Sequence, residues 1–233
     1  MAVELGELRV YHYLKAFGFG EKTGIDLPGE SSGILHHPDV WSGRSLSSLA
    51  MGQEIAVTPI QMVTAMSVVA NGGWLMTPYV VSSVRDAYGQ SVLTHDPRPK
   101  RRPISTKTAT RLTHILEAVV ERGTGKRARL PGYRVAGKTG TSQKIDPETG
   151  RYSSSSVIAS FVGFVPVEQP ALTMLVVLDE PEVDKWGGKI AAPVFGNVAE
   201  RVLPHMGIFP GGAQLIQTAS ISPNAFSPQT FVP

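Results

Sequence analysis

Four consecutive residues, Lys138-Thr139-Gly140-Thr141, combine a cation, two hydroxyls and a glycine in a stretch that is typical of a β-strand. Successive side chains of a strand point to opposite faces, so Lys138 and Gly140 share one face while Thr139 and Thr141 share the other. A strand at the border of a cleft could offer these groups to a ligand. Gly140 would let a substrate backbone approach closely, and main-chain N–H groups could stabilise an oxyanion. The segment therefore predicts a site for an anionic or acyl ligand.

The nucleophile for serine acyl transfer is missing from the pattern. Such enzymes often carry a Ser-x-x-Lys motif, and none occurs in the 233 residues. Thr141-Ser142-Gln143-Lys144 has threonine in the first place of such a motif, but its first residue belongs to the strand itself, so no nucleophile is assigned there. Lys22-Thr23-Gly24 repeats the triplet in a glycine-rich region, where a turn is the better interpretation. Asp179-Glu180 is interpreted as an acidic turn that ends a strand rather than as an acid–base pair.

The composition narrows the class of protein. With 42% hydrophobic and 18% charged residues, the chain is typical of one globular domain with a substantial core. The absence of cysteine excludes disulfides, thiolate metal sites and a cysteine nucleophile. The histidines lack metal-ligand spacing, so neither a metal site nor a cofactor is predicted. The basic run 98–102 is interpreted as a solvated loop rather than a nucleic-acid or lipid contact, because no aromatic residues interleave with its charges.

No signal peptide or membrane span is predicted within the sequence. Glu4, Glu7 and Arg9 interrupt any apolar core near the N-terminus. No apolar segment approaches the roughly 18 to 20 residues that a transmembrane helix requires. Any membrane anchor would have to lie outside this sequence.

The elements expected around the Lys138 segment alternate between helices and strands. Thr58-Pro59 is a strong helix start, with threonine as N-cap and proline at the first helical position. Polar, turn-rich residues 144–152 favour antiparallel pairing of their neighbours, and the continuous apolar run 172–178 predicts a strand buried on both faces. Helices are expected over 3–16, 58–70, 105–122 and 190–205, strands over 79–84, 91–94, 133–142, 157–165 and 172–178, and little regular structure over 21–48. This order predicts an α+β domain, a mostly antiparallel sheet covered by helices.

Longer strings around these elements carry a more specific signal than the triplet. In order, they are Phe17-Gly18-Phe19-Gly20-Glu21-Lys22-Thr23-Gly24-Ile25-Asp26-Leu27-Pro28-Gly29-Glu30, Met51-Gly52-Gln53-Glu54-Ile55-Ala56-Val57-Thr58-Pro59-Ile60-Gln61, Gly123-Thr124-Gly125, Val135-Ala136-Gly137-Lys138-Thr139-Gly140-Thr141-Ser142, Ala159-Ser160-Phe161-Val162-Gly163-Phe164 and Gly187-Gly188-Lys189-Ile190-Ala191-Ala192-Pro193. In this order and spacing, the chain resembles the transpeptidase domain of class B penicillin-binding proteins, above all the septal group, over residues 1 to about 209.

The resemblance implies the fold shared by penicillin-binding transpeptidases and serine β-lactamases, and a D,D-transpeptidase that cross-links peptidoglycan stem peptides through a serine acyl-enzyme. Carried over to this sequence, Lys138 would help to bind the substrate carboxylate and tune the proton network. Gly140 would give clearance, and Thr141 would bind the carboxylate and supply an oxyanion-hole N–H. Thr139 belongs to the motif but is expected to face away from the cleft.

The departures from the family pattern are equally informative. Family members place Ser-x-x-Lys and then Ser-x-Asn upstream, so the resemblance implies that this sequence begins just after the second motif and is incomplete at its N-terminus. Ser222-Pro223-Asn224 matches Ser-x-Asn by chance, since it lies in a Pro- and Ser-rich stretch. Thr230-Phe231-Val232-Pro233 is similar to the start of a PASTA module. Residues 1–209 are therefore expected to form the C-terminal part of a transpeptidase domain, and 210–233 a linker.

Three functional interpretations follow from the sequence. The first is the transpeptidase of an intact parent protein on the periplasmic or extracytoplasmic side of the inner membrane. Its partners would be D-Ala-D-Ala stem peptides, β-lactams and division or elongation proteins, and not nucleic acid. The second is a non-catalytic fragment or a wall-binding scaffold module. The third is a β-lactamase or a penicillin-sensing receptor, against which the strings at Gly52-Gln53 and Gly187-Gly188 argue.

Overall fold

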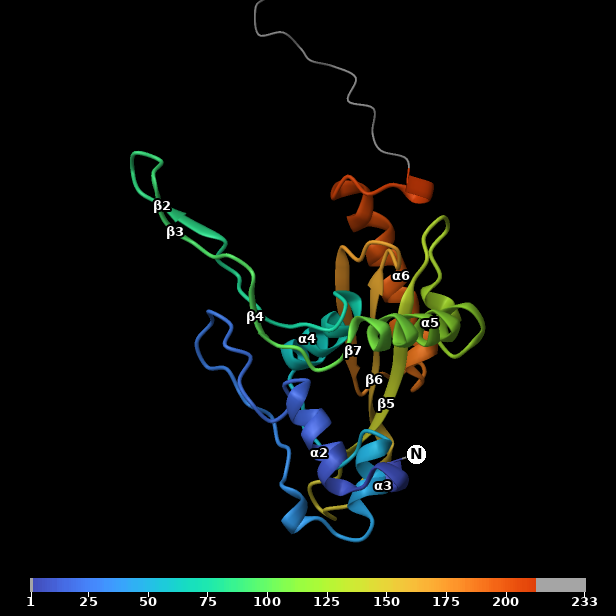
Figure 1. Ribbon diagram of the computed structural model, residues 1–233. Helices are drawn as coiled ribbons and strands as arrows, with labels where there is room; N and C mark the ends of the chain where they lie inside the picture. Colours follow the sequence, from blue (N-terminus) through green and yellow to red (C-terminus); the bar gives the residue numbers. More distant parts are fainter. Residues whose placement is uncertain (1, 213–233) are drawn as a thin grey trace, which may run out of the picture.

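The structure is a computed structural model that describes residues 2–212 (Figure 1). Its helices are α1 (Ala2–Leu5), α2 (Glu7–Ala16), α3 (Ser45–Ala50), α4 (Pro59–Ala70), α5 (Thr106–Arg122) and α6 (Gly187–His205). Its strands are β1 (Leu75–Thr77), β2 (Ser83–Arg85), β3 (Ser91–Thr94), β4 (Arg98–Arg101), β5 (Ala136–Ile145), β6 (Tyr152–Val165) and β7 (Leu172–Asp179). Short 3₁₀ helices cover Pro38–Val40, Lys126–Ala128 and Pro210–Gly212. The predicted α+β class is confirmed.

A three-stranded antiparallel sheet in the order β5-β6-β7 forms the centre of the molecule. Alternation along β6 sends Phe161 to one face and Phe164 to the other. Phe161 packs edge-to-face on Phe195 of α6, with ring centroids 5.0 Å apart. Phe164 packs in a second cluster with Val69 of α4, which side chains of α5 also join. The sheet is therefore covered by α6 on one face and by α4 and α5 on the other.

The helix boundaries that depend on local signals agree with the prediction. Thr58 forms a capping box with Gln61 at the start of α4, and Ser105 caps α5 by accepting from the Thr108 N–H. The N-terminal helix differs, because Gly6 has a φ of 78° and divides it into α1 and α2. Part of the segment predicted to be irregular forms α3.

The basic run 98–102 was wrongly predicted to be a solvated loop. Its residues Arg98–Arg101 form β4, which pairs antiparallel with β1. The Arg101 guanidinium donates to the carbonyls of Lys15, at 2.7 Å, and Ala16, at 2.8 Å, at the end of α2, and also pairs with Glu21. A cation is favourable at a helix C-terminus, where carbonyls lack helical partners. The charge thus joins α2 to the β1–β4 pair.

Strand β7 was expected to be buried on both faces, and this prediction was also wrong. All its residues are partly or fully exposed, and Val177 is 44% exposed. The reason is position: β7 is an outer strand of the sheet in the part of the chain that the structure describes. A continuous apolar run shows that the side chains are hydrophobic, but their burial depends on which elements cover the strand.

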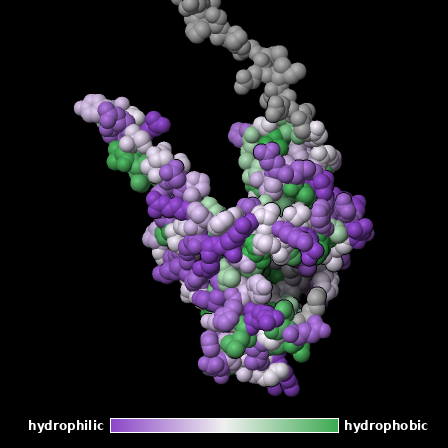
Figure 2. All heavy atoms as spheres, in the orientation of Figure 1, coloured by the Kyte–Doolittle hydropathy of each residue, from purple (hydrophilic) through white to green (hydrophobic). Residues whose placement is uncertain are grey.

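Strands β2 and β3 form a hairpin that projects from the body as an arm (Figures 1 and 2). Its base is attached to the loop that precedes residue 30. The Asp26 carboxylate accepts from the main-chain N–H groups of Val80, at 2.7 Å, and Val81, at 2.9 Å. These two bonds hold the pKa of Asp26 below its ordinary value of 3.8. The predicted strand 79–84 is correspondingly short, because the first part of that stretch serves as the attachment.

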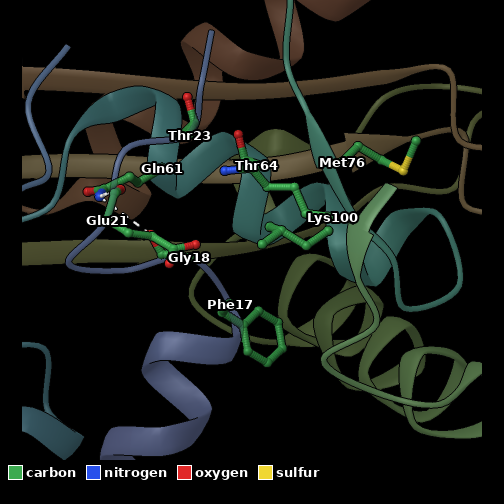
Figure 3. Close-up of a pocket in the computed structure, with 9 residues that line it drawn as sticks. Phe17, Gly18, Glu21, Thr23, Gln61, Thr64, Met76 and Lys100 are labelled. Atoms are coloured by element: carbon green, nitrogen blue, oxygen red, sulfur yellow. Dashed lines mark hydrogen bonds between the residues drawn. The ribbon is translucent and has the colours of Figure 1, made fainter. Parts of the chain in front are cut away.

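The buried amide of Gln61 joins α4 to the long irregular segment before it. Only 1% of Gln61 is exposed, and its Oε1 accepts from the Thr58 N–H at 2.9 Å. Its Nε2 donates to the Glu21 carbonyl at 2.8 Å (Figure 3) and to the Ser32 carbonyl, also at 2.8 Å. An adjacent cavity of about 10 Å³ has room for a single water molecule at most. This seam is therefore structural, with no space for a substrate.

The remaining sequence expectations concern the two ends of the chain. The predicted linker 210–233 lies outside the described residues apart from Pro210–Gly212, and so do the strings at 222–224 and 230–233. Among residues 2–212, no helix combines the length and hydropathy needed to cross a bilayer.

An ion pair between nearly buried Glu117 and half-exposed Arg134 connects α5 to the segment that leads into β5. Glu117 is 7% exposed and receives the Arg134 guanidinium in a two-bond contact, with Nη2 to Oε2 at 2.7 Å. Arg134 also reaches Glu168 at 3.0 Å. The hydrogen bond and charge of Arg134 hold the pKa of Glu117 below its ordinary value of 4.5, although burial acts in the opposite direction.

We expect Glu117→Gln to lower the free energy of unfolding by about 2 kcal/mol at neutral pH, since it weakens bonds to a charged partner. Because the folded-state pKa is depressed, the contribution is complete above pH 4.5 and is lost as the pH falls through the lower folded value. Denaturant unfolding of both proteins between pH 7 and pH 3 should therefore show a difference that shrinks only in acid. The exposed Glu121→Gln on the same helix is the control. A difference independent of pH would contradict the assignment.

Candidate active site

The Lys138-Thr139-Gly140-Thr141 segment lies on β5, an outer strand of the sheet as described (Figure 1). Lys138 is exposed, and its Nζ donates to the main-chain carbonyl of Thr139 at 2.7 Å. The register pairs Lys138 with Val162 and Gly140 with Ser160. The strand therefore has one side along β6 and an opposite side that no described strand covers. The small cavity of Figure 3 is formed by other residues, so it is not part of this site.

The glycine at position 140 lies against a side chain inside the sheet. A Cβ atom built on Gly140 would lie 2.4 Å from the Ser160 Oγ, but 3.8 Å from the Ser160 Cβ. The Ser160 hydroxyl thus occupies the space that a side chain at 140 would need. Gly140 was expected to give clearance to a substrate, and the structure supplies a reason for this glycine that is independent of any substrate.

Thr139 and Thr141 lie on the face of β5 that α6 covers, as alternation predicts. The Thr139 hydroxyl is 2.8 Å from the Thr124 hydroxyl, in the turn that follows α5. The Thr141 Oγ1 accepts from the main-chain N–H of Gly187, the first residue of α6, at 3.2 Å. The expectation that Thr139 faces away from the cleft that Thr141 enters is therefore wrong, because both side chains leave β5 on the same face and Lys138 leaves it on the other.

Two glycines allow α6 to begin directly over β5. A Cβ on Gly187 would lie 2.3 Å from the carbonyl oxygens of both Gly140 and Ser160. A Cβ on Gly188 would lie 2.3 Å from the Thr124 carbonyl oxygen. Such distances leave no room for a side chain, so glycine is needed at both positions for the helix to approach this closely. The start of α6 is thereby in contact with both threonines of the strand and with the turn.

Helix α6 is held in this position in spite of a proline in its second turn. Pro193 has no N–H, so the carbonyl of Lys189, four residues earlier, has no helical donor. The Arg127 guanidinium donates to that carbonyl at 3.1 Å. The 3₁₀ helix Lys126–Ala128 therefore replaces the missing bond and connects the turn after α5 to α6.

The charged groups near the end of β5 are paired. Lys144 lies 3.1 Å from Asp179 and 2.7 Å from Glu180, across β6. The hydrogen bonds that the Lys144 ammonium donates to Glu180 and then to Asp179 raise the pKa of Lys144 above its ordinary value of 10.5. Lys144 thus pairs with the acidic turn, and Asp179-Glu180 serves as a counter-charge. Within residues 2–212, no three His, Cys, Asp or Glu side chains gather into a metal-binding cluster.

Sequence reasoning missed three residues that the structure brings to the site. Thr124, Ser160 and Gly187 all lie in strings that support the family resemblance, but no role was assigned to them. Two signals were available in the sequence: glycines on both sides of Thr124, and the adjacent pair Gly187-Gly188, since glycines allow close backbone packing. The three-dimensional meeting point of these strings with β5 could not be read from the sequence.

Comparison with known proteins identifies the family to which this chain belongs. The family described as penicillin binding protein transpeptidase domain matches residues 1–200. The chain therefore belongs to the penicillin-binding protein transpeptidase family. The crystal structure of penicillin-binding protein 3 from Mycobacterium tuberculosis complexed with ampicillin superposes with a TM-score of 0.83. It is 34% identical and aligns with 94% of this chain and 51% of that chain.

Curated relatives extend the comparison to named cell-wall proteins. Stage V sporulation protein D of Bacillus subtilis is 41% identical over 213 residues, which cover 91% of this chain and 33% of that protein. Peptidoglycan D,D-transpeptidase FtsI of Escherichia coli is 32% identical over 196 residues, which cover 83% of this chain and 31% of that protein. The chain thus spans about a third of the length of these relatives.

Substituting Gly187 by alanine should disturb the start of α6. The added Cβ would meet two main-chain oxygens that cannot rotate away, and overpacking of this kind costs about 1 to 3 kcal/mol. Denaturant unfolding should report this loss in Gly187→Ala. The control is Gly43→Ala, because a Cβ there meets nothing within 4 Å. Equal stability of the two variants would show that α6 can move away from β5 without cost.

Proposed function

We propose that this chain supplies the substrate-binding wall of a peptidoglycan D,D-transpeptidase. The observation that carries the proposal is the arrangement of Thr139 and Thr141 on an outer strand, with both hydroxyls held by fixed neighbours. Family membership and the named relatives support the chemistry.

The chemical role of each residue follows from its place on β5. The Thr141 hydroxyl accepts from Gly187 N–H, so its own proton remains available to a ligand acceptor such as the terminal carboxylate of a D-Ala-D-Ala peptide. Thr139 offers a second hydroxyl beside it. Residues of an edge strand alternate between main-chain groups that pair inward and groups that point outward. If the Thr139 carbonyl points outward, Thr141 N–H does too, and it suits an oxyanion.

Lys138 contributes a positive charge at the same strand edge. Its ammonium, bonded to the Thr139 carbonyl, lies at the main chain rather than extended into solvent. From there it can attract the substrate carboxylate and stabilise a deprotonated neighbour in the proton network. Gly140 leaves the Lys138 face of the strand without a side chain at that position, so a substrate backbone can approach there.

The reaction proposed for the complete enzyme needs an atom that no Ser-x-x-Lys motif supplies in this sequence. A serine would attack the carbonyl of the penultimate D-alanine, form an ester and release the terminal D-alanine. An amine of a neighbouring stem peptide would then take the acyl group and regenerate the serine. A β-lactam would acylate the same serine with opening of its ring. The contribution of residues 1–209 would be to bind and orient the acyl donor.

The setting is proposed from the names of the relatives. Peptidoglycan synthesis places such an enzyme on the outer side of the bacterial inner membrane, with stem peptides as substrates and division or elongation proteins as partners. A second candidate, a non-catalytic or scaffold module, is favoured by one observation, the lack of Ser-x-x-Lys in the 233 residues. Labelled penicillin distinguishes the two candidates.

The decisive experiment joins the full chain to the preceding part of stage V sporulation protein D, where the family pattern places the Ser-x-x-Lys motif. We expect this fusion to form a covalent adduct with a fluorescent penicillin and to lose it when that serine is replaced by alanine. The unfused chain should form no adduct. A folded fusion that is never labelled would favour the scaffold module.

In the same fusion, Lys138→Ala should slow acylation about a hundredfold, which is the typical cost of removing one group that stabilises developing charge. The exposed Lys126→Ala is the matched control and should retain the parent rate. The rate of adduct formation is read from gel fluorescence over time. Acylation of Lys138→Ala at the parent rate would remove Lys138 from the site.

A further inference from the structure

The turn Gly123-Thr124-Gly125 is built to present one side chain to β5. Gly123 N–H and Gly125 N–H both donate to the Val119 carbonyl at 3.0 Å. A Cβ on Gly123 would lie 2.9 Å from Val119 atoms, and one on Gly125 would lie 3.1 Å from the Phe161 ring. The turn is therefore packed against the end of α5 and the sheet core, and a side chain on either side of Thr124 would displace its neighbours.

Thr124 is also confined from the side of α6. Its carbonyl oxygen is the atom that a Cβ on Gly188 would meet at 2.3 Å. Its side chain is exposed, and its hydroxyl lies 2.8 Å from the Thr139 hydroxyl. An exposed threonine would ordinarily gain little from a rigid backbone. Here the backbone holds that hydroxyl at hydrogen-bonding distance from a residue of the Lys-Thr-Gly segment, fifteen positions later.

A hydroxyl has one proton and two acceptor lone pairs, so the direction of the Thr124–Thr139 bond decides what Thr139 can offer. If Thr139 donated to Thr124, its proton would be used and it could only accept from a ligand. If Thr124 donates, the Thr139 proton is free to point to a ligand acceptor. The neighbouring Thr141 hydroxyl accepts from a main-chain N–H, so its own proton is free to point to a ligand acceptor.

We propose that Thr124 is a positioning residue that donates to Thr139 and so directs the Thr139 proton to the carboxylate of the acyl donor. The inference rests on the proposed function. With the carboxylate bound, the chain from Thr124 to Thr139 to the carboxylate runs in one direction, and each bond polarises the next. Thr139 and Thr141 then act as two matched donors, one supported by a side chain and the other by the start of α6.

The test uses the fusion described above and three variants. Thr124→Val removes the hydroxyl and keeps the shape, whereas Thr124→Ser keeps the hydroxyl. Thr110→Val is the control, because Thr110 is also exposed and its hydroxyl donates to the Thr106 carbonyl within α5, away from the strand. Each protein is acylated by a fluorescent penicillin and by its methyl ester, which lacks the charged carboxylate. Thermal melts verify that each variant is folded.

We expect Thr124→Val to slow acylation by the acid about tenfold, in line with the loss of a supported hydrogen bond to a charged group. Acylation by the ester should keep its rate, and Thr124→Ser should restore the rate with the acid. An unchanged rate with the acid would overturn the inference, and so would an equal loss with acid and ester, which indicates a structural role. A parent fusion that is not acylated at all would overturn the proposed function, and this inference with it.

Discussion

The close approach of α6 to the β5–β6 pair is the constraint on which the candidate site depends. Gly187 begins the helix directly above the carbonyls of Gly140 and Ser160, where no side chain fits. The Phe161–Phe195 contact in the hydrophobic core holds the same helix against β6. Because the first N–H groups of a helix lack helical acceptors, one of them is free to bond Thr141. The packing of α6 therefore determines the geometry of the site, because a helix held further from β5 would lose its hydrogen bond to the Thr141 hydroxyl.

Elsewhere, single polar side chains position segments that have little regular structure. Gln61 bonds to carbonyls 40 and 29 residues away in the sequence, Asp26 holds the base of the arm, and Arg101 binds the end of α2. Each satisfies main-chain groups that would otherwise lack partners. A segment such as 17–37 can therefore be ordered without helices or strands, because several of its main-chain groups find side-chain partners.

The sequence predicted features that are encoded locally. The cap at Thr58, the helix start near residue 105 and the alternation along β5 depend on neighbours within a few residues, and the structure has them. It did not predict β4, the break at Gly6 or the exposure of β7, because these depend on tertiary contacts or on one glycine's backbone angle. The site shows the same division. Lys138 to Thr141 were found as a string, whereas Thr124 and Gly187 meet that string only across 15 and 46 residues.

In the proposed enzyme, β5 supplies groups that bind the acyl donor, whereas the nucleophilic serine does not come from a Ser-x-x-Lys motif of this sequence. These two kinds of group affect the reaction barrier differently. A wall that binds an acyl donor contributes orientation and charge stabilisation, and each of its groups changes the barrier by a limited amount. The attacking serine is different in kind, because without it no covalent intermediate forms. Substitutions on β5 should thus give graded effects, while the presence of the serine decides whether there is any reaction. In the proposed enzyme, residues 2–212 would contribute binding and orientation, because the glycines, the turn and the helix start place the hydroxyls of Thr139 and Thr141 along one strand.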